Sequence, residues 1–362
     1  YIRQRVYGMD EVKAEVAKWT PDEVERVTGV PENQVYAAAK AMADNRPGTF
    51  IWCMGGTQHT IGNNNTRAYC AFQLALGNIG VSGGGANIFR GHDNVQGATD
   101  LGVLADTLPG YYGLAPGSWG HWARVWDLDP AWIKGRFDNT AYDKDGKEYI
   151  GEYDEKSKAV HVMNTKGIPV SRWIDGVLED KGAIAQRDNV RAMFMWGHAP
   201  NSQTRGPEMK KAMEKLDLLV VVDPYPTVSA VMHDRTDGVY LLPACTQFET
   251  YGSVTASNRS LQWRDKVIEP LFESLPDHTI MYKLAKKLGF ADEFTKHIAV
   301  NNDEPLIEDI TREFNRGMWT IGYTGQSPER LKLHQQNWGT FDYTSLKAEG
   351  GPADGDFYGM PW

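Results

Sequence analysis

Residues 89–102 read Phe89-Arg90-Gly91-His92-Asp93-Asn94-Val95-Gln96-Gly97-Ala98-Thr99-Asp100-Leu101-Gly102. The segment places one arginine among glycines and side-chain amides, directly after a second glycine cluster at 83–85. Glycine lets a backbone approach a ligand closely. Arginine presents a planar fork that matches a carboxylate or phosphate with two parallel hydrogen bonds. The segment therefore predicts a site at which an anion lies close to the backbone.

The residues before this segment follow the order helix, helix, strand, glycine-rich loop, helix. Thr20-Pro21-Asp22-Glu23 is a helix start, with a Thr cap, Pro at the first position and Glu three residues after the cap. A second helix is expected from Pro31 to Met42. The short apolar run at 48–53 predicts a buried strand, which ends in a loop at 54–59 before a helix at about 66–76. This order is typical of an α/β unit with ligands at the carboxyl end of its strand.

The same pattern returns further along the chain. We expect strands at 191–196, 218–222 and 239–244, with a loop at 197–202 and helices at 208–216 and 227–232. Two strand-to-loop junctions in one β-α-β stretch predict a nucleotide-type crevice. Beyond residue 245, helices are expected at 278–288 and 305–316, and the aromatic-rich segment 319–362 is expected to be irregular.

The predicted fold class is α/β, with Rossmann-like dinucleotide-binding units built on parallel or mixed sheets. Residues 1–92 are expected to form the C-terminal part of one such domain, and 93–240 a second. Within the second, the charged stretch near 127–190 carries turn signals such as Asp143-Lys144-Asp145-Gly146 and predicts an insertion. Residues 241–362 are expected to be helical and irregular, and to pack on the rest of a longer subunit.

Composition narrows the possible partners. The chain has 362 residues, 41% of them hydrophobic, and a formal net charge of −9. A nucleic-acid partner is not expected, because no basic surplus exists to neutralise phosphates. The apolar run at 218–222 is far too short to span a bilayer.

The three cysteines, Cys53, Cys70 and Cys245, are widely separated and form no C-x-x-C pair. This spacing predicts neither a disulfide framework nor a zinc or iron–sulfur site. Each is expected to be a buried, small apolar residue. No metal-ligating residue is predicted in this chain.

The segment around Arg90 resembles the catalytic (alpha) subunit of molybdenum- or tungsten-dependent formate dehydrogenases, in the molybdopterin oxidoreductase (DMSO reductase) superfamily. In that family an Arg-Gly-x-x-Asn-x-Gln-Gly segment lies over the metal, and its Arg holds formate. The resemblance implies that Arg90 is catalytic and that Gly91, Asn94, Gln96 and Gly97 lead toward the pterin. The alternative from the residues alone is a tight turn with a salt-bridged arginine.

Three further segments resemble cofactor-binding loops of the family, in which a bis-molybdopterin guanine dinucleotide holds the metal. The loop at 54–59 is similar to a Gly-x-x-Gln-His loop, and 197–202 to a Gly-x-Asn-Pro loop with its Pro and Asn reversed. The third, at 222–227, is similar to a strand end that recognises the guanine and ribose of the dinucleotide. The residues implied are Met54, Gly55, Gln58, Gly197, Asn201, Ser202, Asp223, Pro224 and Thr227. An ordinary strand-to-helix turn at 54–59 and a helix cap at Asp223 are the alternatives.

A fourth block, Leu242-Pro243-Ala244 followed by Glu249, Gly252 and Asn258-Arg259, is characteristic of the superfamily rather than of formate oxidation. The alternative is a strand end and a polar turn. Residues 325–332 also resemble the membrane-associated, periplasm-facing branch of formate dehydrogenases. The resemblance therefore favours the periplasmic face of the inner membrane, with a cytoplasmic enzyme as the alternative.

The family's catalytic subunit is longer at both ends, so we expect this chain to be its central part. A 4Fe–4S cluster and the Cys or selenocysteine that ligates the metal are expected upstream. The implied partners are the rest of the subunit, an iron–sulfur beta subunit, a possible cytochrome b subunit, and formate or carbon dioxide. A nitrate- or arsenite-type oxidoreductase and a non-catalytic scaffold are the alternative functions.

Overall fold

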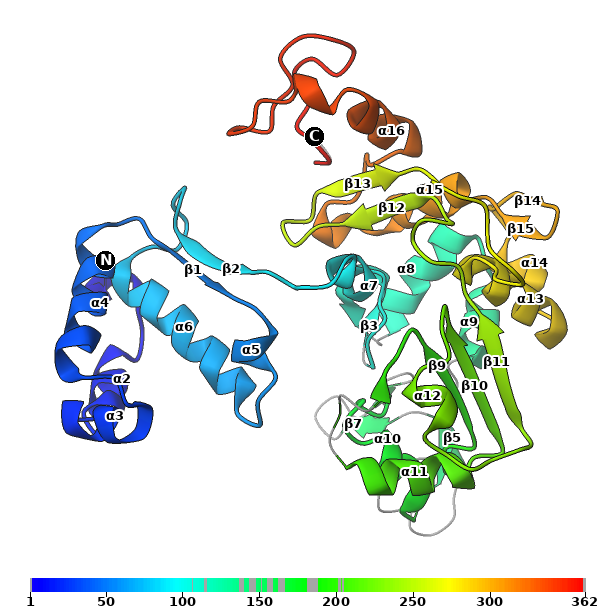
Figure 1. Ribbon diagram of the computed structural model, residues 1–362, viewed down its shortest axis with the longest axis horizontal. Helices are drawn as coiled ribbons and strands as arrows, with labels where there is room; N and C mark the ends of the chain where they lie inside the picture. Colours follow the sequence, from blue (N-terminus) through cyan, green and yellow to red (C-terminus); the bar gives the residue numbers. More distant parts are fainter. Residues whose placement is uncertain are drawn as a thin grey trace. The chain divides into compact units, whose positions relative to one another are not determined.

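A computed structural model describes residues 2–105, 107–113, 116–136, 140–142, 148–150, 152–154, 159–161, 167–180, 188–200, 203 and 205–360. The chain divides into two compact units, Tyr1–Val95 and Gln96–Trp362 (Figure 1). Both contain helices and parallel strands, which confirms the predicted α/β class.

The first unit begins with helices whose ends follow local sequence signals. In α3, the Thr20 hydroxyl accepts a hydrogen bond from the Glu23 amide at 3.4 Å, as the predicted cap requires. The same helix ends at Gly29, which adopts a left-handed φ of 72°. The elements of this unit are α1 (Ile2–Arg5), α2 (Met9–Val16), α3 (Pro21–Thr28), α4 (Glu32–Asp44), β1 (Thr49–Trp52), α5 (Met54–Thr57), α6 (Gly62–Leu76) and β2 (Gly85–Ile88).

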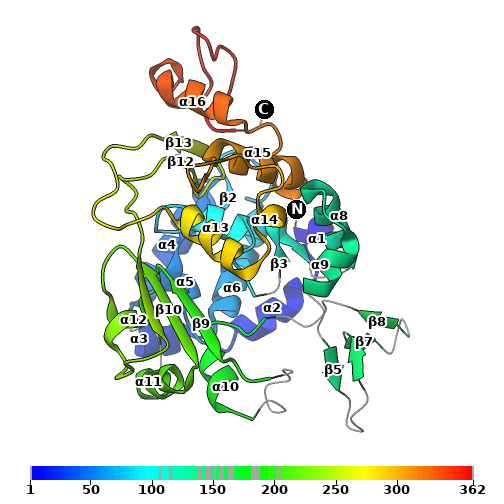
Figure 2. The same cartoon turned by 90° about the vertical axis from the view of Figure 1, so that its right-hand side faces the viewer.

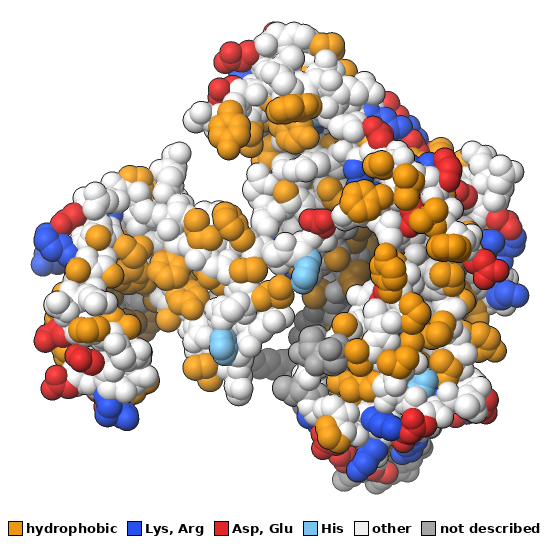
Figure 3. All heavy atoms as spheres, in the orientation of Figure 1, with side chains coloured by type: hydrophobic (Ala, Val, Ile, Leu, Met, Phe, Trp, Pro, Cys, Tyr) orange, Lys and Arg blue, Asp and Glu red, His pale blue; other side chains and the backbone are white. Residues whose placement is uncertain are grey.

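The sheet of the first unit consists of β1 and β2, paired in parallel from Thr49↔Gly85 to Trp52↔Ile88. Helix α6 covers one face, where the Phe50 and Tyr69 rings stack with centroids 4.8 Å apart. On the other face Ile51 is 53% exposed. The strand predicted at 48–53 is confirmed as β1, but its predicted burial was wrong, because only one face of this two-stranded sheet is covered among the described residues. Figure 3 shows apolar side chains at the surface of this unit.

A buried side-chain amide fastens the two strands at their amino ends. Gln73 of α6 is fully buried, and its Nε2 donates to the carbonyl oxygens of Gly48, at 2.8 Å, and of Gly85. The Asn78 amide in turn donates to Gln73 Oε1 at 2.8 Å. One glutamine thus satisfies a backbone carbonyl at each strand, which the hydrogen bonds between the two strands alone would not do.

The second unit contains a parallel sheet in the order β11–β10–β9, with β10 in the middle (Figure 1). Side chains of β10 alternate between its faces. Leu219 and Val221 pack with α10 and α11, whereas Val220 and Val222 pack with Ile280 of α13. The predicted strands and the α11 helix are confirmed, and the central strand β10 is covered on both faces.

The elements of the second unit begin with α7 (Val95–Asp100), which starts one residue before the division. They continue as β3 (Thr107–Leu108), η1 (Pro109–Tyr111), β4 (Tyr112–Gly113), α8 (Pro116–Trp126), α9 (Pro130–Arg136), β5 (Thr140–Tyr142), β6 (Glu148–Ile150), β7 (Glu152–Asp154), β8 (Ala159–His161), α10 (Trp173–Leu178), β9 (Ala192–Trp196), α11 (Gly206–Lys215), β10 (Leu218–Asp223), α12 (Val228–Val231) and β11 (Val239–Pro243). The last part contains β12 (Gly252–Thr255), β13 (Leu261–Arg264), α13 (Asp277–Leu288), α14 (Ala291–Phe294), β14 (Val300–Asn301), β15 (Glu304–Pro305), α15 (Ile307–Gly317), η3 (Trp319–Ile321), α16 (Pro328–Gln336) and η4 (Trp338–Thr340).

The charged range 127–190 contains two antiparallel strand pairs, β5–β6 and β7–β8 (Figure 2). Helix α10 lies in the same range but belongs to the core. Its Trp173, Ile174 and Val177 are buried in one cluster with Met209 and Met213 of α11. The end of the predicted insertion therefore returns to the sheet.

A second core joins α8, α15, α16 and the β12–β13 hairpin, which lies beside α15 in both views (Figures 1 and 2). Trp122, Met318 and Leu331 are at most 1% exposed within it. The approach of α15 to α8 is close enough that a Cβ at Gly317 would lie 2.6 Å from the Trp122 ring. Glycine is required there by packing.

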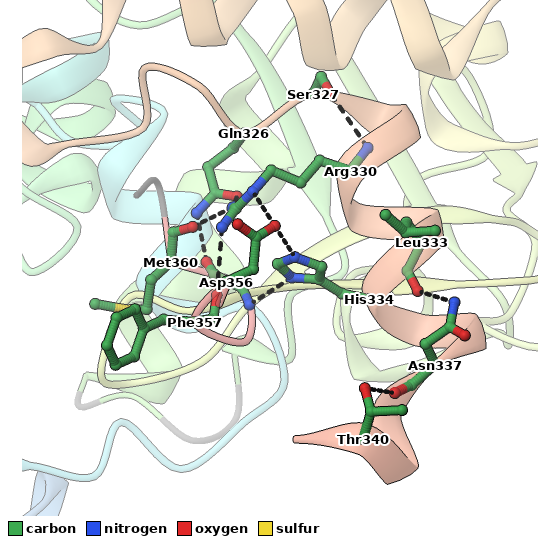
Figure 4. A network of polar contacts seen from close by, with 11 residues as sticks. Gln326, Ser327, Arg330, Leu333, His334, Asn337, Thr340, Asp356, Phe357 and Met360 are labelled. Atoms are coloured by element: carbon green, nitrogen blue, oxygen red, sulfur yellow. Dashed lines mark hydrogen bonds and ion pairs between the residues drawn. The ribbon is translucent and has the colours of Figure 1, made fainter. Parts of the chain in front are cut away.

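The prediction that 319–362 is irregular was wrong for α16. The Ser327 hydroxyl accepts a hydrogen bond from the Arg330 amide at 3.1 Å, and Pro328 occupies the first helical position. The chain after the helix folds back onto it (Figure 4). His334 Nε2 donates to Asp356 at 3.0 Å, and the Gly359 amide donates to Nδ1 at 3.0 Å. Burial lowers the pKa of His334, which is consistent with an acceptor nitrogen at Nδ1.

Glu313 of α15 should make stability depend on pH. Burial raises the pKa of Glu313 to about 7, against a partial lowering by Arg316. The folded state then binds a proton that the unfolded state has already released, so stability should fall as pH rises from about 4.5 towards 7. Glu313→Gln should therefore raise Tm over wild type by roughly 3 °C at pH 8 and by little at pH 4.5. Calorimetry at both pH values tests this, with exposed Glu349→Gln as control. A gain of equal size at both pH values would contradict it.

Candidate functional site

In the first unit, two of the predicted site segments leave the sheet at the same edge. β1 ends at Trp52 and runs into Met54, and β2 ends at Ile88 and runs into Arg90. The Phe89 amide donates to the Trp52 carbonyl at 3.0 Å, which continues the pairing beyond the strands. A Cβ at Gly91 would lie 3.3 Å from the terminal methyl of Met54. The structure therefore brings the 54–59 and 90–91 segments together at the carboxyl end of the parallel pair.

The segment at 54–59 was predicted as a loop, but Met54–Thr57 is a single helical turn, α5. The Gln58 amide donates to the Met54 carbonyl at 2.7 Å, and the ring of His59 donates to the Gly55 carbonyl at 2.6 Å. The Gln58 side chain lies over the Met54 sulfur at 3.3 Å. No described atom lies within 4 Å of a Cβ built at the exposed Gly55. Its backbone is therefore open to a ligand.

The Arg90 segment needs its small residues for conformational reasons. Gly91 has a φ of 89° and Asn94 a φ of 57°, both in the left-handed region that Gly and Asn tolerate best. Arg90 itself is half-buried. Two positions of the family motif, Gly91 and Asn94, are thus also positions where the turn favours these residue types.

Helix α7 follows with a buried polar cluster. Gln96 Nε2 donates to Asp100 Oδ1 at 2.8 Å, and both residues are buried. The Tyr323 hydroxyl donates to Asp100 Oδ2 at 2.6 Å and is hydrogen-bonded to the Thr255 hydroxyl at 2.9 Å. Arg259 Nε lies 3.5 Å from the same carboxylate. Sequence reasoning missed Tyr323, which lies 223 residues from Asp100 and outside any local motif.

In the second unit, the remaining predicted residues lie at the carboxyl edge of the β11–β10–β9 sheet. Gly197 follows β9, and its amide donates to the Val222 carbonyl of β10 at 2.9 Å. Asp223 ends β10, and its Oδ1 accepts from the Tyr225 amide at 3.3 Å. Asp223 does not cap α12, because Thr227 holds that position. Asn201 and Ser202 lie outside the described residues.

A cavity of about 100 Å³ opens at this edge. It is lined by the strand ends and the turn after β10, namely Val221, Asp223, Pro224, Tyr225, Pro226, Ala230, Leu241, Leu242 and Pro243. The half-buried side chain of Asp223 is the one carboxylate in this lining. An apolar hollow with a single acidic acceptor can hold part of a ligand that donates hydrogen bonds.

Two observations test whether these residues fit a pterin dinucleotide. Thr227 Oγ1 is buried without a hydrogen-bond partner among the described residues. A buried unpaired hydroxyl is costly, but Thr227 does not line the cavity, so a ligand could pair with it only if this edge rearranged. No described atom lies within 4 Å of a Cβ at Gly197, as at Gly55. The open space at these two glycines therefore fits a ligand that approaches the backbone closely.

The block from 242 to 259 has a structural explanation for its glutamate. Glu249 is 4% exposed and accepts hydrogen bonds from the amide and hydroxyl of Thr246, both at 2.7 Å, and from the Leu271 amide at 2.6 Å. The backbone hydrogen bond from Thr246 is the main reason why the pKa of Glu249 is lowered. The carboxylate thus links the turn at Thr246 to the chain at Leu271 through hydrogen bonds.

The cysteines differ in exposure. Cys245 is buried as predicted, and burial raises its pKa. Cys70 is exposed and Cys53 half-buried, so the prediction of three buried cysteines was wrong. Cys70 lies on α6 on a face that no described residue covers. Within the described parts of the chain, no group of three His, Cys, Asp or Glu side chains is placed to hold a metal ion.

Residues 32–287 match the family model of the molybdopterin oxidoreductases, and the chain therefore belongs to this family. Its relatives include the F420-dependent formate dehydrogenase subunit alpha of Methanocaldococcus jannaschii, 29% identical over 94% of this chain and 42% of the relative. Formate dehydrogenase H of Escherichia coli is 28% identical over 86% of this chain and 37% of the relative. The chain thus spans between 28% and 42% of the length of curated relatives such as these.

A solved structure with a similar fold is acetylene hydratase from Pelobacter acetylenicus. The TM-score is 0.51 at 15% sequence identity, over 98% of this chain and 46% of that one. The similarity concerns the fold alone. Among the described helices, none is long and apolar enough to cross a membrane.

Proposed function

We propose that this chain is part of the catalytic subunit of a formate dehydrogenase, which oxidises formate reversibly to carbon dioxide. The observation that carries the proposal is the Arg90 segment, in which Gly91 and Asn94 hold left-handed conformations and Gly91 lies next to Met54 at one sheet edge. Several relatives are named formate dehydrogenases, which supports the same substrate.

Arg90 would bind and orient formate. The substrate is a three-atom anion with almost no apolar surface, so its binding depends on charge-assisted hydrogen bonds. A guanidinium supplies two of them in a fixed geometry, which also aims the C–H bond. Two-electron redox chemistry is what a molybdenum or tungsten pterin group supplies when it is bound.

The cofactor in this proposal is a bis-molybdopterin guanine dinucleotide. In the first unit, Met54, Gly55, Gln58, Gly91 and Asn94 would contact it, followed by Gln96 and Gly97 of α7. At the second sheet edge Gly197, Asn201, Ser202, Asp223, Pro224 and Thr227 would hold a dinucleotide. The open space at Gly55 and Gly197 supports this assignment. Asp223 would accept from ribose hydroxyls or guanine N–H groups.

Electrons would leave through iron–sulfur clusters, first a 4Fe–4S cluster and then an iron–sulfur beta subunit, with a cytochrome b subunit as a further partner. Some relatives are named alpha subunits, which supports an assembly of several chains. The periplasmic face of the inner membrane is the compartment that the resemblance of 325–332 favours.

Dye reduction by the complete purified enzyme tests the proposed function. Formate should reduce an artificial electron acceptor, whereas reduced acceptor with nitrate, or oxidised acceptor with arsenite, should give no turnover. The metal and pterin content must be measured in the same preparation. An enzyme loaded with cofactor that turns over nitrate or arsenite but not formate would contradict the proposal.

Loss of Asp223 should weaken retention of the dinucleotide rather than affinity for formate. One hydrogen bond to a charged group contributes about 1.5–3 kcal/mol, so Asp223→Ala should release the cofactor roughly tenfold faster. The matched control is Asp217→Ala, which removes a surface carboxylate just before the same strand, paired with Arg191 at 2.5 Å. Pterin fluorescence after acid release measures retention. A raised KM for formate with unchanged pterin content would place Asp223 in another pocket.

A further inference from the structure

Helix α7 carries two residues of the proposed cofactor site, yet it is too short to hold its own shape. It has six residues, and isolated helices below about 12–15 residues are marginal in water. Its position must therefore come from tertiary contacts. The side chains of Thr99 and Asp100 make these contacts, and Gln96 is joined to them by its hydrogen bond to Asp100 within the helix.

The centre of the contacts is the carboxylate of Asp100, which is fully buried. It receives hydrogen bonds from Gln96 at 2.8 Å and from Tyr323 at 2.6 Å, and Arg259 lies 3.5 Å away. Burying a carboxylate is costly unless it is paired and hydrogen-bonded. Removal of any partner should therefore disturb Asp100 itself, and with it the end of α7.

The partners come from three distant parts of the unit. Tyr323 follows η3, Arg259 lies in the turn between β12 and β13, and Tyr111 ends η1. The Tyr111 hydroxyl is hydrogen-bonded to the Thr99 hydroxyl at 3.0 Å. The Arg259 guanidinium lies 5.8 Å from the centre of the Tyr111 ring, within cation–π range. Each part alone could move, but together they fix α7 from several sides.

Two of these partners hold unfavourable backbone conformations. Arg259 has a φ of 64° and Tyr111 a φ of 59°. Residues other than glycine keep such angles only where the surroundings enforce them, and these outliers cluster at functional sites. Both outliers lie beside α7. They indicate that this part of the chain is built to hold α7 in one position, rather than only to stabilise the fold.

We propose that Asp100, Tyr323 and Arg259 form a positioning network that fixes Gln96 and Gly97 for the pterin group. The proposal rests on the proposed function, because it assigns a purpose to the residues that hold α7. The network fixes the orientation of the Gln96 amide, whose NH₂ group donates to Asp100. None of the three residues needs to touch formate or the pterin, so they act through α7.

Tyr323→Phe in the full-length, cofactor-loaded enzyme tests the network. The ring remains and one hydroxyl is lost, so Asp100 loses its shortest hydrogen bond. Pterin release after dilution should become about tenfold faster, which corresponds to one such bond. KM for formate should change less than twofold. The matched control is Tyr251→Phe, which removes a hydroxyl that donates to Glu308 at 3.4 Å in the same unit. Its pterin release should equal that of wild type.

Two further variants distinguish a network from independent contacts. Asp100→Asn combined with Tyr323→Phe should release pterin little faster than Asp100→Asn alone, because both changes break one network. Arg259→Lys, which keeps the charge, should retain more pterin than Arg259→Gln.

Pterin release from Tyr323→Phe no faster than from Tyr251→Phe, at equal Tm, would overturn the positioning role. So would strict additivity of the double variant. A wild-type enzyme that binds pterin but does not oxidise formate would refute the proposed function instead. The comparison of pterin release between Tyr323→Phe and Tyr251→Phe would still test the positioning network.

Discussion

In the complete enzyme, Arg90→Ala should lower kcat/KM for formate by about 10²–10⁴-fold. This corresponds to about 3–5 kcal/mol, the usual cost of truncating one partner of a buried, hydrogen-bonded charge pair. Formate offers no apolar surface that could replace the lost bonds. Arg90→Lys should recover part of the binding but little of the turnover, since a compact ammonium cannot fix the direction of the C–H bond.

Steady-state kinetics on both variants measures this effect, with metal and pterin content determined for each preparation. Arg67→Ala is the matched control, because it removes an exposed arginine from α6 of the same unit. It should leave kcat/KM unchanged. Near-wild-type turnover by fully loaded Arg90→Ala would remove the main support for formate as the substrate.

Gly62→Ala should destabilise the first unit by about 3 kcal/mol, at the upper end for overpacking. Gly62 is the buried first residue of α6, and a Cβ there would overlap the carbonyl oxygen of Thr57. That atom belongs to the backbone, so relief requires α5 and α6 to separate. Hydrogen exchange of the α6 amides should accelerate by more than a hundredfold, as this free energy implies.

Gly55→Ala provides the contrasting variant in the neighbouring helix α5. No described atom lies within 4 Å of its Cβ, so α6 should keep its protection in hydrogen exchange. Pterin content should nevertheless fall if the cofactor approaches this backbone. Unchanged hydrogen-exchange protection of the α6 amides in Gly62→Ala would contradict this prediction. It would show that the turn between α5 and α6 can open at no cost in free energy.

The sequence predicted most of the elements that have a local signal. The cap of α3, the three strands of the larger sheet and helix α13 were all expected, since each depends on residues a few positions apart. α16 was missed although Ser327-Pro328 is the same kind of start as Thr20-Pro21. The aromatic and glycine-rich composition around it obscured the signal.

The site was less predictable, for a physical reason. Motif residues such as Gly91 reveal themselves because a positive φ restricts which residue can stand there. Tyr323 has no such local restriction, and its importance arises only from a buried carboxylate 223 residues away. The unpaired hydroxyl of Thr227 is likewise a property of the folded edge. Such contacts depend on topology, which a single sequence does not display.

Gln73 limits how the sequences of this family can diverge. Its amide serves the two carbonyls beside β1 and β2 while Asn78 donates to its oxygen, so the pair forms one closed unit of donors and acceptors. A change of Gln73 to Glu would set a negative charge against two carbonyl oxygens, and a change to Leu would leave them unpaired. Neither is rescued by a single substitution elsewhere. Position 73 should therefore keep its glutamine among homologues, and position 78 should keep a side chain that can donate to the Gln73 oxygen.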